Sequence, residues 1–318
     1  MKKHSAFTMI ELVMVIVVFG IVASIGAEIV TSIYNSYLRT RAINRLQSQT
    51  EITLEQIAKR LQYRIKDSVR ASDNNGTTWS ALPNAGVGFT TIEWIGISNE
   101  SFLGEYNGTS VVPGWSGLID MDSNNTRLAT RTLETPGSRL DFASEIIFAL
   151  TSYPNGSIDM NNTNGKLPAL IFKGVKSTTA TLAYNVNNYY SVGQNNYTLR
   201  VGRGANTRLV IPNDDNLTDF DGDGFGDLFE QYYLSHTAYA LVPVGSTSDF
   251  NLTLRYNYQP WNGENYNAVN IPSSVLAQNV STFRIRQEGD VVRIKLCIHD
   301  NNQSGNFDFS ACKEKVIY

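Results

Sequence analysis

The first part of the chain is an uninterrupted apolar stretch. Residues 7–27 contain a single charged side chain, Glu11. A helix of this length would rise about 31 Å at about 1.5 Å per residue, which is enough to cross the hydrocarbon core of a bilayer. A secretory signal peptide would have a shorter apolar region that ends at a small-residue cleavage site, whereas this stretch continues into a helical pattern. We therefore predict a transmembrane helix over residues 7–27.

The pattern then changes to one apolar side chain every three or four residues, which is typical of an amphipathic helix. The positions that follow this spacing are Ile43, Leu46, Leu54, Ile57, Leu61, Ile65 and Val69. No proline precedes Pro83, and the first cluster of turn-forming residues is 72–76. The pattern predicts one long helix over residues 7–71, half in lipid and half packed on a domain.

From residue 72 onward, short runs of β-branched and aromatic residues alternate with turns rich in asparagine, glycine, serine and proline. These runs predict strands over residues 88–97, 145–151, 169–175, 180–186, 197–201, 208–211, 239–244, 251–256, 282–287, 291–298 and 315–318. The segments between them lack the helical periodicity that parallel crossovers need. The sequence thus predicts an α+β fold, in which the long helix packs on a large, mostly antiparallel β domain over residues 72–318. Its clearest hairpin is centred on residues 288–290.

Charge is distributed unevenly along the chain. Residues 1–38 are neutral and residues 39–70 carry a net charge of +5, while the remainder carries −8, for a formal total of −3. A protein that coats nucleic acid needs a concentrated basic surface, so the composition argues against nucleic acid as a partner without excluding it. Two cysteines, asparagine-rich loops and the lack of a cytosolic nucleotide-binding signature place residues 28–318 outside a bacterial inner membrane, in the periplasm or on the cell surface.

The carboxylate of Glu11 is the most informative group in the apolar stretch. A charged side chain at the centre of a bilayer costs about 2.5–3.5 kcal/mol on insertion scales and normally has a cationic partner. A short basic leader, residues 1–6 with the sequence MKKHSA, precedes the segment FTMIEL that contains this glutamate. The arrangement resembles the prepilin signal of type IV pilins and type II secretion pseudopilins.

The resemblance implies a processing reaction and an assembly contact. A membrane peptidase would cleave between Ala6 and Phe7 and N-methylate Phe7, and Glu11 would meet the amino terminus of a neighbouring subunit. The residue before the cut is usually glycine in this family, so Ala6 departs from the pattern.

The resemblance also implies a fold, partners and a function. It implies a pilin-like subunit that assembles through its N-terminal helix with other pilin or pseudopilin subunits, and that depends on a prepilin peptidase and on inner-membrane lipid. The last predicted hairpin is similar to the C-terminal strands of minor pilins and J-type minor pseudopilins. The large body favours a tip or priming subunit over a compact major subunit. The alternatives are a fibre-tip adhesin or DNA-capturing subunit, and a singly anchored periplasmic calcium-binding protein without a fibre.

Residues 219–230 match the calcium-loop spacing D-x-D-x-D-G-x5-E at every defined position. The predicted ligands are Asp219, Asp221, Asp223, the carbonyl of Phe225, Asp227 and Glu230. A ligand set made only of oxygen favours Ca²⁺ over zinc. The flanking sequence does not predict two long helices, so we expect an isolated loop that stabilises the body. The alternative is a solvated acidic turn.

A second, weaker candidate for a metal loop lies near the C-terminus. Its oxygen-bearing positions are Asp300, Asn302, Ser304, Asn306 and Asp308. The closing acid is missing, because Ala311 stands in its place, and a plain Asn-Gly turn is the alternative. The loop lies between Cys297 and Cys312, the only cysteines, and a disulfide between them would contribute about 3 kcal/mol by loop entropy. The pilin resemblance implies the same bond.

The sequence contains no catalytic signature. A G-x-S-x-G elbow, a complete G-x-G-x-x-G, a phosphate loop and H-E-x-x-H are all missing, so we do not expect an enzyme. Four aromatic residues lie close together in the sequence at Tyr256, Tyr258, Trp261 and Tyr266. If exposed, this cluster would suit adhesion; otherwise it forms part of the core.

Overall fold

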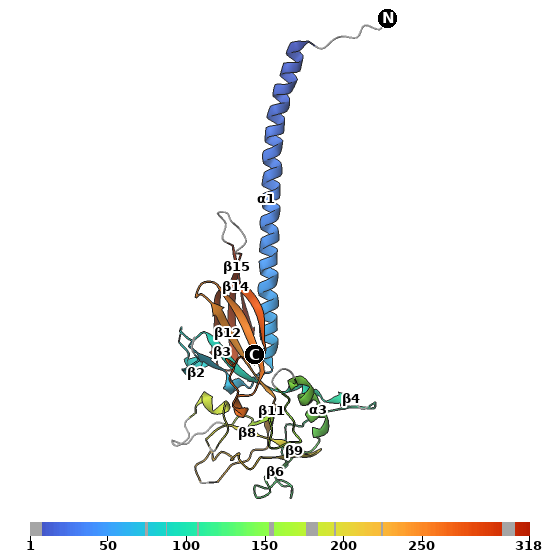
Figure 1. Ribbon diagram of the computed structural model, residues 1–318, viewed down its shortest axis with the longest axis vertical. Coiled ribbons are helices and arrows are strands. Elements are labelled where there is room, and N and C mark those ends of the chain that lie inside the picture. The colour runs from blue at the N-terminus through green and yellow to red at the C-terminus, as the bar shows by residue number, and fades with distance from the viewer. Residues whose placement is uncertain are drawn as a thin grey trace.

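The computed structural model describes residues 8–318 except 74–75, 87, 107, 153–155, 176–183, 194, 224 and 301–308. One long helix, α1 (Met9–Gln62), dominates its shape. The first half of α1 stands clear of the body, and the second half lies along a β-rich domain (Figure 1). This layout confirms the predicted α+β, pilin-like architecture.

Eight antiparallel strands form the main sheet, in the order β16-β15-β14-β13-β12-β3-β1-β2. Their bounds are β1 (Arg70–Ser72), β2 (Trp79–Ala81), β3 (Thr91–Gly96), β12 (Thr237–Gly245), β13 (Phe250–Tyr258), β14 (Ser273–Glu288), β15 (Val291–His299) and β16 (Ser310–Ile317). The predicted hairpin is confirmed, because Glu288 pairs with Val291 and Gly289 adopts a positive φ of 58° in the turn. Strands from both ends of the body therefore share one sheet.

The second half of α1 packs on one face of this sheet, over β14, β15 and β16. Its apolar stripe, which includes Leu54, Ile57 and Leu61, is buried there together with alternate residues of the strands such as Ile294 and Leu296. The amphipathic pattern of the sequence thus identified the buried face of the helix.

Two ion pairs align α1 with the edge strand β16. Glu51 pairs with Lys313 at 2.6 Å, and Glu55 pairs with Lys315. Four residues of helix advance about 6 Å, and two residues of strand advance about 6.6 Å. The equal steps show that β16 and this part of α1 run alongside each other in the same direction.

The helix ends at Gln62, and the predicted end at residue 71 is wrong. Beyond it the chain joins the sheet, where the backbone N–H of Ile65 donates to the carbonyl oxygen of Ile95 at 2.9 Å. Ile65 and Val69 are nevertheless buried, as their spacing predicted. Apolar periodicity reports which side chains enter the core, and here it continued after the helical backbone had ended.

A second lobe, residues 98–235, lies at the end of the body away from the start of α1 (Figure 1). We call it the distal lobe. Its sheets have the orders β6-β10-β9, β11-β7-β8 and β4-β5. Its elements are α2 (Asn99–Leu103), β4 (Glu105–Tyr106), β5 (Val111–Val112), β6 (Thr132–Glu134), α3 (Leu140–Thr151), β7 (Ala169–Phe172), β8 (Thr198–Arg200), β9 (Gly202–Ala205), β10 (Arg208–Val210) and β11 (Tyr232–Ser235).

The predicted strand over residues 145–151 is wrong, because this segment forms the second half of α3. Its run of apolar and β-branched residues is compatible with a buried strand. The buried positions, however, are Leu140, Ala143, Ser144, Ile147 and Thr151, and they follow a helical spacing. Four of the predicted residues 180–186 lie outside the described part of the chain.

A buried ion pair lies within the main sheet, at the place where the distal lobe packs on it. Arg70 on β1 and Glu93 on β3 approach to 2.6 Å, with side chains 11% and 2% exposed. The hydroxyl of Tyr258 donates to the other carboxylate oxygen of Glu93 at 2.7 Å. The guanidinium of Arg70 lies between two rings, 4.0 Å from the centroid of Trp79 and 3.4 Å from that of Tyr190. Each charge therefore has its partners within the core.

Replacing Arg70 by Met should lower the free energy of unfolding by about 3–5 kcal/mol, because it leaves the carboxylate of Glu93 buried without its counter-charge. The double variant Arg70→Met/Glu93→Gln should recover part of this loss. Denaturant titration of the full chain in detergent would measure both, with Arg127→Met as an exposed control. Equal unfolding midpoints for Arg70→Met and the control would contradict a stabilising role of the Arg70–Glu93 pair.

Candidate functional site: the N-terminal helix and the acidic loop

The first half of α1 is apolar and exposed. Every described residue up to Tyr37 is exposed, including large apolar side chains such as Met9 at 84% and Phe19 at 72%. The helix is long and apolar enough to cross a membrane. Such a surface needs an apolar environment, which lipid or the helices of neighbouring subunits would provide.

At the start of α1, the carboxylate of Glu11 accepts two hydrogen bonds from Thr8. The backbone N–H donates at 3.0 Å and the hydroxyl at 2.8 Å. Within a single chain, the Glu11 side chain thus provides an acceptor for the backbone N–H of Thr8, which has no partner inside the helix. The predicted processing residues, Ala6 and Phe7, lie outside the described residues.

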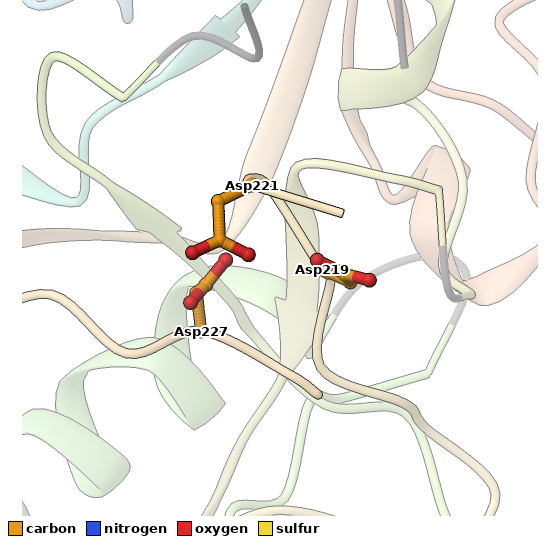
Figure 2. A group of neighbouring side chains, drawn as sticks. All are labelled: Asp219, Asp221 and Asp227. Carbon is orange, nitrogen blue, oxygen red and sulfur yellow. The ribbon is translucent and has the colours of Figure 1, made fainter. Parts of the chain in front are cut away.

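The predicted calcium loop lies between β10 and β11, and the described residues on both sides of it form no helix. Asp219, Asp221 and Asp227 each turn one carboxylate oxygen toward the others, within 4.8 Å (Figure 2). Asp221 is exposed, and the other two are partly buried. Three of the five acidic side chains predicted as ligands are therefore brought together.

The other predicted ligands are placed differently. Asp223 does not belong to the converging group, and one of its carboxylate oxygens accepts a hydrogen bond from the backbone N–H of Phe225 at 2.8 Å. Asp219 and Asp221 accept similar bonds from backbone N–H groups of the turn. Glu230 is exposed and does not belong to the converging group. Asp227 accepts from the backbone N–H of Phe220 at 2.7 Å and thereby links the end of the loop to its beginning.

Two aromatic side chains within the loop anchor it in the core. The rings of Phe220 and Phe229 lie 5.4 Å apart, and Phe220 is only 7% exposed. Phe220 stacks on Tyr197 at 5.7 Å, and Phe229 meets Phe172 at 5.4 Å. Because both ends of the loop reach into one aromatic row, movement of the carboxylates would alter the packing around Tyr197.

Cys297 and Cys312 form the predicted disulfide, with an S–S distance of 2.10 Å. The two residues are directly paired in the register of β15 and β16. The bond therefore fixes the edge strand on which α1 packs.

Little of the second predicted metal loop falls within the described residues. Asp300 is described, and its backbone N–H donates to the carbonyl oxygen of Phe309 at 3.1 Å. Asn302, Ser304, Asn306 and Asp308 lie outside the described residues.

Three of the four clustered aromatic residues form part of the core, so the structure does not support the adhesive alternative. Tyr258, Trp261 and Tyr266 are at most 2% exposed, and Tyr256 is 36% exposed. The indole N–H of Trp261 donates to the carbonyl oxygen of Leu167 at 2.9 Å, so the ring serves the core. Residue type alone could not separate an exposed cluster from a buried one.

One buried pair, which no sequence motif indicated, has the residue types of a hydrolase dyad. The hydroxyl of Ser98 lies 2.8 Å from Nδ1 of His236, and both side chains are buried. Ser98 also contacts the hydroxyl of Ser101, which accepts a hydrogen bond from the indole of Trp115. The burial denies access to substrate. The network instead joins α2 to the corner between β11 and β12.

A known family model matches the start of the chain. Residues 1–27 match the model of the prokaryotic N-terminal methylation motif. This motif is the signature of type IV pilins and pseudopilins, which are structural subunits and not enzymes. It confirms the prepilin resemblance of the leader and implies, in general terms, processing by a prepilin peptidase and assembly with other pilin subunits. No curated protein and no solved structure matches the chain.

The stability of the body should depend on pH through His236. Burial lowers the pKa of this imidazole from its usual 6.5 to about 4, so the unfolded chain takes up a proton that the folded chain does not. Above pH 6.5 the imidazole is neutral in both states and does not affect the free energy of unfolding. As the pH falls from 6.5 toward 4, protonation of the unfolded chain lowers this free energy by up to about 3 kcal/mol.

Unfolding titrations of wild type and His236→Asn between pH 7 and 4 would test this expectation. The loss of stability should be smaller in the variant, and His299→Asn serves as the matched control. Parallel curves for wild type and His236→Asn would contradict the assignment.

Proposed function

We propose that this chain is a minor pilin or pseudopilin subunit of a type IV pilus-type or type II secretion-type assembly, in a tip or priming position. The observation that carries the proposal is the methylation motif at residues 1–27, because it covers most of the exposed apolar half of α1. The size of the body, residues 70–318, favours the tip or priming position over a repeating place in the shaft.

The assembly contact follows from the environment of Glu11. Its hydrogen bonds to Thr8 satisfy the carboxylate geometrically but supply no positive charge. In lipid, an uncompensated carboxylate costs about 2.5–3.5 kcal/mol. The free amino terminus of a neighbouring processed subunit would provide the missing charge and fix the axial position of one helix against the next.

Calcium is the second part of the proposal. Asp219, Asp221 and Asp227 would hold the ion, with the carbonyl of Phe225 as a further oxygen. Binding would relieve the repulsion among these carboxylates and fasten the aromatic anchors of the loop. The disulfide is consistent with a body in the periplasm or on the cell surface, since such bonds persist in oxidising compartments.

Mass spectrometry of the chain expressed with a prepilin peptidase tests the processing step. The expected mature protein begins at N-methyl-Phe7, and Ala6→Gly should be cleaved at least as fully. Glu11→Gln should be processed but recovered less in membrane-extracted complexes with other pilin subunits, whereas Glu28→Gln should behave like wild type. An intact Met1 terminus in the wild type would overturn the proposed route.

Thermal unfolding of the full chain with and without Ca²⁺ tests the loop. At a free concentration 100 times Kd, the ion should add about 2.7 kcal/mol to the free energy of unfolding. Asp221→Asn should remove most of this gain, and Asp122→Asn, an exposed control outside the loop, should retain it. The near-ultraviolet signal of the tyrosines should change on binding. Identical melting curves in Ca²⁺ and in chelator would refute the calcium site.

A further inference from the structure

The face of β14 and β15 that is turned away from α1 carries a concentrated positive charge. Its residues alternate with core residues such as Ile285 and Ile294, which pack under the helix. The four cations on this outer face are Arg284, Arg286, Arg293 and Lys295, and all are exposed. We call them the basic face.

The strand register places like charges directly opposite each other. Arg284 faces Lys295, and Arg286 faces Arg293. Such cross-strand pairs destabilise a sheet. Two exposed carboxylates on the same face offset part of this charge. Glu288 pairs with Arg286 at 3.2 Å, with side chains 52% and 77% exposed, and Glu314 of β16 faces Lys295 in the strand register. The basic face thus holds four cations against two carboxylates, and its surplus of positive charge suits an anionic partner.

Acidic charge collects in the distal lobe. The distal lobe has 15 acidic and nine basic residues, a net charge of −6. Several of its cations already have partners, since Arg139, Arg200 and Arg208 form ion pairs within the lobe. Its exposed acidic residues include Asp120, Asp122, Asp214, Asp221, Asp223 and Glu230.

The two charged regions are separated along the long axis. The β14–β15 turn that borders the basic face reaches the end of α1, where Asp290 pairs with Lys66, and the distal lobe lies beyond the end of the helix (Figure 1). Subunits that are staggered along parallel helices would bring the distal lobe of one copy beside the basic face of the next. A contact between two different surfaces of the same chain can join two copies without closing into a ring.

We propose that the basic face docks on the acidic distal lobe of a second copy of this chain. This inference rests on the assembly function proposed above, with two neighbouring copies of this chain at the tip or priming end. Lipid is too far away to be the partner, because α1 reaches the sheet at about Leu46, roughly 29 Å beyond residue 27 and several Debye lengths from the headgroups. The net charge of −8 over residues 71–318 opposes nucleic acid.

Sedimentation of the purified full chain in detergent, at about 20 and 300 mM NaCl, measures the association. Wild type should self-associate at least tenfold more tightly at low salt. The variant Arg286→Ala/Arg293→Ala should self-associate at least tenfold more weakly than wild type at low salt. Its melting temperature should be unchanged or raised, because a like-charged pair is removed. Arg127→Ala/Lys173→Ala, which removes two exposed cations of the distal lobe, should not weaken association.

A charge-reversal pair identifies the partner surface. Arg286→Glu/Arg293→Glu and Asp120→Lys/Asp122→Lys should each associate weakly alone and recover association when mixed. If the first variant misfolds, Arg284→Ala/Lys295→Ala provides the same test. Association that is equal in wild type and the alanine variants, or a monomer at both salt concentrations, would overturn the proposal. So would binding to single-stranded DNA or anionic vesicles without self-association.

This experiment is independent of processing, because it uses the purified chain without peptidase. Salt-sensitive association of an unprocessed chain would support the docking proposal even if the proposed pilin function were wrong. A chain that is processed but does not self-associate in this way would support the proposed pilin function and contradict the docking proposal.

Discussion

Burial of the second half of α1 against β14–β16 is the contact on which the rest of the molecule depends. Each fully buried leucine or isoleucine in this interface, such as Leu54, Ile57 or Leu61, contributes about 1.5–3 kcal/mol. Thr50 and Thr53 lie in the same interface, and the hydroxyl of Thr53 donates to the carbonyl oxygen of Leu276 at 3.1 Å. The body thereby holds the helix firmly, and the exposed apolar half is presented as a rigid extension.

The orientation of the distal lobe depends on a second, smaller set of contacts. Arg70 belongs to the main sheet, yet it donates to the side-chain oxygen of Asn187 in the lobe at 2.8 Å and stacks on Tyr190. The hydroxyl of Tyr190 in turn donates to the carbonyl oxygen of Ser68 at 2.7 Å. Buried charge and aromatic rings therefore fix this part of the distal lobe relative to the main sheet. A fully satisfied polar network of this kind specifies one arrangement more strictly than apolar packing does.

Features with strong local signals were predictable. The apolar stretch, the glutamate within it, the cysteine pair and the long C-terminal strands all follow from composition and spacing. The end of α1 was overestimated because Ile65 and Val69 keep a helical spacing while their backbone is no longer helical. The three-residue strands β1 and β2 are too short to produce a pattern, and tertiary pairing alone defines them.

The acidic loop shows a different limit of sequence reasoning. Its spacing indicates the chemistry of the ligands, but backbone conformation decides which carboxylates converge. Asp223 turns toward the N–H of Phe225, and Asp221 turns toward Asp227. The aromatic anchors Phe220 and Phe229 lie within the motif, yet their partners Tyr197 and Phe172 are distant in the sequence. Such long-range contacts cannot be predicted from the local sequence of the loop.

The alignment of β16 with α1 has a mechanical consequence. A pull along the helix axis acts parallel to β14, β15 and β16, so it loads their hydrogen bonds in shear. Bonds loaded in this way must break together, whereas a perpendicular pull would open them one after another. The covalent link between Cys297 and Cys312 adds a bond across the outermost pair of strands. The strands nearest the helix therefore form the part of the body best suited to carry tension along a fibre.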